Sequence, residues 1–180
     1  MYKSLNFLFA FFIAIAACKK TGNPNNENEH DAITTVQLIF KTDTLPPDTF
    51  FYDDPDGDGG NYPLTIDTIK LTSKKIYNVE VRFLNKTKNP AVDVTQIVIE
   101  QATAHEVFYL PLGLNLLIEK TDKDKAGFPL GLKSIWSTAT PLQKGQIRIK
   151  LMHKPVVKGA NDSPNIGHTD VDIYMPIIVE

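Results

Sequence analysis

The sequence is poor in cysteine: among its 180 residues there is one, Cys18. A single thiol excludes a disulfide within the chain, so a folded domain must draw its stability from its core. The sequence also lacks an unbroken run of about 20 apolar residues, the length that a membrane-spanning helix needs. Its 19 basic residues are scattered among 21 acidic ones, a balance that excludes the basic surface of a nucleic-acid-binding protein.

Signatures of common enzyme classes are missing as well. The sequence contains no G-x-S-x-G, no H-E-x-x-H, no phosphate-binding loop and no dinucleotide fingerprint. A periplasmic-binding fold of the first type would need alternating strands and helices over a longer chain. We therefore predict that the protein is not an enzyme of these classes.

What the sequence does contain is an N-terminal export signal. Residues 1–17 begin with a charged start at Lys3, continue as an almost unbroken apolar run, and end in small residues. This order is typical of a secretory signal peptide. The run leads into Ile15-Ala16-Ala17-Cys18, which looks like a bacterial lipobox, where the cysteine receives a diacylglycerol. We predict that Cys18 is lipidated and becomes the first mature residue.

A polar segment separates this cysteine from the rest of the chain. Residues 19–31 read KKTGNPNNENEHD and include no apolar side chain. Such a segment cannot bury surface, so residues 18–31 are expected to be the lipidated cysteine and a disordered tether. Residues 32–180 have a length that suits one domain. The expected location is the outer membrane, with the domain on either its periplasmic or its surface face.

Alternating apolar and polar residues dominate the predicted domain. The alternating or β-branched runs that predict strands are 33–40, 49–52, 64–71, 76–84, 106–112, 114–120, 130–137, 146–152 and 170–179. The runs 64–71 and 76–84 flank a short turn and predict a hairpin. We predict a mainly β fold, an antiparallel β-sandwich of eight or nine strands with one short helix.

A helix signal and two single residues refine this prediction. Asp93 followed by Gln96 is a capping-box pattern, and Val94, Ile97 and Val98 then fall near helical spacing, which predicts a helix over residues 94–104. The alternative is a strand, because Val98 and Ile99 are β-branched. Trp136 is the only tryptophan and is expected to anchor the core. Pro176 interrupts the last run and indicates an edge position or an irregular end of that strand.

An acidic loop is the candidate calcium site. Asp54, Asp56 and Asp58 alternate before Gly59, as in the first half of a calcium-binding loop, and hard oxygen ligands on a tight turn suit this ion. However, Thr65 occupies the position where an EF-hand has its bidentate glutamate. The alternative is a solvated turn, because Asp-Gly pairs form turns readily. Calcium is the one cofactor that the sequence suggests.

Three histidines form a second candidate site. His105, His153 and His168 lie in separate segments, which a sandwich could bring together, and three imidazoles would suit zinc or copper. No two of them have the short spacing of a metal motif. The alternative is that each is an ordinary strand-end histidine.

The order of several short motifs resembles a family of small, poorly characterised lipoproteins from Bacteroidetes-type bacteria. The motifs are the loop 54–60, residues 81–84, 106–109, 122–124, 131–133, 153–155 and 169–172, which together cover nearly the whole predicted domain. The resemblance implies an exported lipoprotein with an immunoglobulin-like β-sandwich and no established activity.

Three functions follow as hypotheses. The first is a lipid-anchored, non-enzymatic module that binds an envelope protein or a small ligand and reaches the membrane through Cys18. The second is a metal-dependent envelope enzyme that uses the histidine or aspartate cluster. The third is a purely structural envelope protein.

Overall fold

The computed structural model describes residues 32–56, 60–139, 142–154 and 158–180. Cys18, the tether and Asp58 lie outside the described residues. A compact unit runs from Asp31 to Glu180. Among the described residues, no helix is both long enough and apolar enough to span a membrane.

The described part of the chain is mainly β, as predicted. The strands are β1 (Thr35–Lys41), β2 (Asp48–Asp53), β3 (Thr65–Ile66), β4 (Ile69–Leu71), β5 (Ile76–Asn85), β6 (Val92–Asp93), β7 (His105–Leu112), β8 (Leu116–Lys120), β9 (Lys133–Thr138), β10 (Gln143–His153) and β11 (His168–Val179). One short α-helix, α1 (Thr95–Glu100), is followed by a 3₁₀ turn, η2 (Ala102–Ala104). These eleven strands exceed the predicted eight or nine because the predicted run 64–71 forms two short strands, β3 and β4, and the two-residue β6 lies outside the predicted runs.

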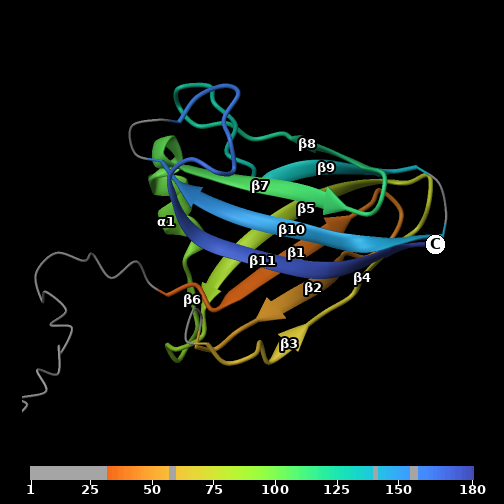
Figure 1. Ribbon diagram of the computed structural model, residues 1–180, viewed down its shortest axis with the longest axis horizontal. Coiled ribbons are helices and arrows are strands. Elements are labelled where there is room, and N and C mark those ends of the chain that lie inside the picture. Colours follow the sequence, from red (N-terminus) through yellow and green to blue (C-terminus); the bar gives the residue numbers. More distant parts are fainter. Residues whose placement is uncertain (1–31, 57–59, 140–141, 155–157) are drawn as a thin grey trace, which may run out of the picture. The chain divides into compact units, whose positions relative to one another are not determined.

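The strands form two sheets (Figure 1). The first has the order β3-β2-β1-β5-β9-β8, with β6 added to β5, and the second has the order β4-β11-β10-β7. All described pairs are antiparallel except β4 with β11, which is parallel. The antiparallel class is therefore confirmed with one exception, whereas the immunoglobulin-like topology stays a prediction.

The predicted hairpin between residues 64–71 and 76–84 is wrong. β3 pairs with β2, β4 pairs with β11 of the other sheet, and β5 pairs with β1 and β9. The reason is burial: β4 lies in the second sheet, where its apolar side chains Ile69 and Leu71 are buried to 0% and 2% exposure. Alternation of side chains marks a strand but does not say which neighbour it pairs with.

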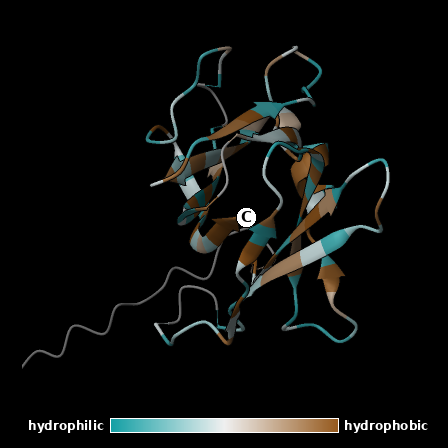
Figure 2. Cartoon of the chain, turned by 90° about the vertical axis from the view of Figure 1, so that its right-hand side faces the viewer, coloured by the Kyte–Doolittle hydropathy of each residue, from teal (hydrophilic) through white to brown (hydrophobic). Residues whose placement is uncertain are grey.

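Trp136 anchors the core between the sheets, as predicted. It is 0% exposed, and its ring lies 5.1 Å from that of Phe40 in β1 and 5.4 Å from that of Tyr109 in β7. These edge-to-face contacts join the two sheets, because Phe40 belongs to the first and Tyr109 to the second. Figure 2 shows hydrophobic residues concentrated in the strands.

A helix is confirmed at this place, but α1 ends at Glu100 rather than at residue 104, and its predicted cap is wrong. Val94 occupies the N-cap position and makes no side-chain capping bond. Asp93 Oδ1 instead accepts the Thr95 N–H at 2.9 Å, and the Gln96 amide donates to Glu100 Oε1 at 3.3 Å. The helix therefore starts one residue later than the capping-box pattern predicts.

Pro176 lies beside a single neighbouring strand. It faces Gln146 of β10, while β4 pairs only with residues 177–179 of β11. The missing N–H of proline is tolerated at such a position.

Candidate functional site

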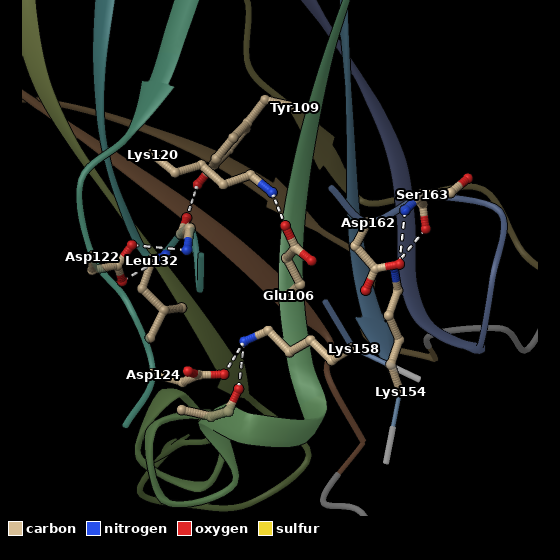
Figure 3. A network of polar contacts seen from close by, with 12 residues as sticks. Glu106, Tyr109, Lys120, Asp122, Asp124, Leu132, Lys154, Lys158, Asp162 and Ser163 are labelled. Carbon is tan, nitrogen blue, oxygen red and sulfur yellow. Dashed lines mark hydrogen bonds and ion pairs between the residues drawn. The ribbon is translucent and has the colours of Figure 1, made fainter. Parts of the chain in front are cut away.

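Charged side chains gather on the outer face of the second sheet, at its α1 end. Val107 and Tyr109 of β7 point into the core, so Glu106 and Phe108 point to the opposite face. Glu106 and Phe108 are nevertheless buried. We call the residues Glu106, Lys120, Asp124, Lys154, Lys158 and Asp162 the ion-pair cluster (Figure 3).

The first pair of the cluster joins β7 to β8. Lys120 Nζ lies 2.5 Å from Glu106 Oε1, and the Glu106 side chain is only 3% exposed. The same ammonium group lies 3.9 Å from the centre of the Phe108 ring, and Lys154 Nζ lies 4.4 Å from it. Burial lowers the pKa of Lys120, and the Glu106 carboxylate only partly opposes that shift. Phe108 thus packs against two ammonium groups.

The second pair ties the β8–β9 connection to the β10–β11 connection. Lys158 Nζ lies 2.9 Å from Asp124 Oδ2, and both side chains are almost fully buried. Lys158 also donates to Ala102 O at 2.7 Å, which brings η2 into the same cluster. Burial alone would raise the pKa of Asp124, but the bond from Lys158 and the N–H groups of Phe128 and Ala126 outweigh burial and lower it.

The third pair lies within the β10–β11 connection. Lys154 Nζ is 3.0 Å from Asp162 Oδ1, and the Lys154 side chain is 0% exposed. It also donates to Ser163 O at 2.5 Å. Burial would raise the pKa of Asp162, but the bonds from Lys154 and the Ser163 N–H lower it overall. Glu106 Oε2 and Asp162 Oδ2 have no hydrogen-bond partner among the described residues, so the cluster keeps two buried acceptors.

The side chain of Asp122 binds backbone groups of the adjacent loop. Its two carboxylate oxygens accept the N–H groups of Gly131 at 2.8 Å and Leu132 at 3.0 Å. Tyr109 Oη in turn donates to Gly131 O at 2.8 Å. Burial, and next the negative charge of Asp122, raise the pKa of Tyr109 well above its ordinary value. The carboxylate of Asp122 is therefore used to shape the loop.

The structure brings the three candidate histidines onto neighbouring strands. His153 of β10 is the register partner of both His105 in β7 and His168 in β11. The His105 and His153 rings stack with centroids 4.7 Å apart. His105 Nδ1 lies 3.1 Å from Gln101 O, and its Nε2 lies 3.3 Å from Asp170 Oδ2. Both nitrogens of the buried His105 ring therefore face protein oxygens, which leaves neither directed at a metal position.

The candidate calcium loop is described only in part, because Asp58 lies outside the described residues. Asp56 Oδ2 accepts the backbone N–H of Asn61 at 3.3 Å and its side-chain amide at 2.5 Å. The hydrogen bond from the Asn61 side-chain amide is the main cause of the lowered pKa of Asp56. Within the described residues, no group of three or more His, Cys, Asp or Glu side chains is placed to hold a metal ion. Calcium binding stays a prediction.

The burial of the cluster's lysines does not follow from the sequence pattern. Lys154 follows β10 directly, where a strand pattern gives way to a loop, and Lys158 lies inside that loop. Lysines in such places are usually solvated. The burial of Lys154 and Lys158 depends on Asp162 and Asp124, which are distant from them in the sequence.

Searches against protein-family models, curated proteins and solved structures find no match to this chain. The resemblance to lipoproteins of Bacteroidetes-type bacteria therefore stays an expectation from short motifs.

Proposed function

We propose that this protein is a lipid-anchored module of the cell envelope that binds a partner rather than catalysing a reaction. The observation that carries the proposal is the position of Cys18, the sole thiol, directly after the apolar run and Ile15-Ala16-Ala17. A diacylglycerol there would hold the chain in a bilayer, since each buried CH₂ group contributes about 0.8 kcal/mol. The proposed location is the outer membrane.

The ion-pair cluster supports binding rather than catalysis. Each of its carboxylates, on Glu106, Asp124 and Asp162, is paired with a lysine. Buried ion pairs stabilise a fold little compared with apolar packing, but they fix one arrangement of the segments they join. Here Lys158 joins the β10–β11 connection to the β8–β9 connection and to η2. A fixed loop surface favours recognition, because little ordering is then required on binding. An envelope protein or a small ligand is the proposed partner.

The anchor is tested by detergent-phase partitioning of the protein produced in a bacterial host with a lipoprotein pathway. The wild-type chain is expected in the detergent phase, and Cys18→Ser in the aqueous phase, because serine has no thiol to acylate. The control is Asn25→Ser, which also introduces a serine but places it in the tether, and this variant should partition like the wild type. Detergent-phase partitioning of Cys18→Ser would contradict the proposed anchor.

A further inference from the structure

β8 is an outermost strand of the first sheet. Among the described residues it pairs with β9 alone, and Figure 1 shows β8 and β3 at opposite margins of this sheet. Just beyond the paired residues of β8 and β9, the Thr121 N–H donates to Lys133 O at 2.9 Å. Hydrogen-bonded pairs alternate along antiparallel strands, so the odd-numbered residues of β8 are the ones that bond to β9. The N–H and C=O groups of Leu116 and Ile118 therefore point to the open side. No described residue bonds to them there.

Apolar side chains are left uncovered on both faces of β8. Leu117, on the solvent face, is 71% exposed. Leu116 and Ile118 face the core but are only partly buried. On the solvent face, Ile76 of β5 is 65% exposed as well, and it is separated from Leu117 by the register position of Ser137 in β9. One more strand beside β8 would cover apolar surface on both faces.

We propose that β8 pairs antiparallel with β8 of a second copy of this chain, about a two-fold axis at Leu117. In that register Leu116 lies opposite Ile118 of the second copy, and Leu117 lies opposite Leu117 of the second copy. Leu116 and Ile118 are the residues whose backbone groups are open, so they can exchange hydrogen bonds. Asn115 then faces Glu119, an amide donor opposite a carboxylate acceptor.

The residues of β8 favour this register and a second copy as the partner. A register shifted to centre on Ile118 would place the exposed Leu117 opposite Glu119, whereas the Leu117-centred register opposes apolar to apolar on both faces. Lys120 is the one basic residue of β8, and its ammonium group is already paired with Glu106 at 2.5 Å, so it brings no unpaired charge to the interface. A two-fold pairing also covers the open edge of β8 in both copies, which removes a site for uncontrolled strand pairing.

Disulfide trapping tests both the contact and its register. All variants carry Cys18→Ser, which removes the native thiol and the anchor. At the two-fold axis, the two Cα atoms of residue 117 would lie about 4.5 Å apart, as in a non-hydrogen-bonded antiparallel pair, a spacing that suits a disulfide. Leu117→Cys is expected to form a covalent dimer under mild oxidation. Glu119→Cys, on the same face of the same strand, and Leu64→Cys, at a distant exposed leucine, are expected to stay monomeric.

Trapping of all three variants to the same extent, or of none, would overturn the proposal. The molar mass of the Cys18→Ser chain in solution gives an independent measurement by light scattering. It is expected to be twice that of one chain, and Leu117→Lys should halve it by setting two ammonium groups opposite each other. Leu64→Lys is the matched control and should stay dimeric. A dimer that survives Leu117→Lys would contradict the proposed interface.

Discussion

At the scale of single residues, the pair Lys158–Asp124 makes the sharpest prediction. Both side chains are almost fully buried, so Lys158→Met leaves the Asp124 carboxylate without its counter-charge. Removing one partner of a buried pair typically lowers the free energy of unfolding by about 3 kcal/mol. Lys41→Met breaks the exposed pair with Glu80 and should cost less than about 1 kcal/mol. Urea denaturation of both variants measures the difference, and equal losses would contradict the account.

Asp124 and Asp162 also predict how stability depends on pH. Each has a folded-state pKa below its ordinary value of 3.8. The resulting stabilisation is fully present above that ordinary value and is lost as the pH falls through the lower folded-state pKa. The free energy of unfolding should therefore fall as the pH drops below about 4. Asp124→Asn should make that fall shallower, and an unchanged slope in urea titrations at several pH values would count against this assignment.

The sequence sufficed for residues whose role depends on their own chemistry. Trp136 could be assigned to the core because a lone large aromatic seldom stays exposed. Lys154 could not be assigned to a buried cluster, because its burial depends on Asp162 and Ser163 folding back over it. The three histidines lie on neighbouring strands, where His153 is the register partner of both His105 and His168. The pattern could not show that His105 already contacts Gln101 and Asp170.

At the scale of elements, Gly145 controls how β10 meets the β7–β8 turn. A Cβ atom at this position would lie 2.2 Å from Leu112 O and 2.5 Å from a Leu114 methyl carbon. Gly145→Ala is therefore expected to lower the free energy of unfolding by about 2 kcal/mol, because the backbone oxygen has to shift. Gly159→Ala is the control, since a Cβ there meets nothing within 4 Å. If thermal melting shows similar effects for both, the close approach is not tight.

The existence of elements could be predicted better than their pairing. Most of the longer strands follow from alternation, and α1 follows from the change to helical spacing near residue 94. The partners of β4 could not be predicted, because its three residues have the same pattern in either sheet. Strand pairing depends on which core each apolar face enters, and that is a property of the whole domain.

At the scale of the whole molecule, the proposed lipid anchor and the proposed pairing of domains reinforce each other. A lipid on Cys18 would place the domain at a membrane, and pairing through β8 would give each assembly two such anchors. Two linked anchors leave a bilayer far more slowly than one, because release requires both to detach together. The lipidated, Cys18-intact chain should therefore dissociate from vesicles faster when it carries Leu117→Lys than when it carries Leu64→Lys. Equal dissociation rates would argue against pairing at the membrane.

The central claim is that the mature protein begins at a lipidated Cys18. Mass spectrometry of the N-terminal peptide, from protein isolated from bacterial membranes, tests this most directly. The expected peptide starts at Cys18 and carries a diacylglyceryl group on its sulfur. A mature chain that starts at another residue, or an unmodified Cys18, would contradict it.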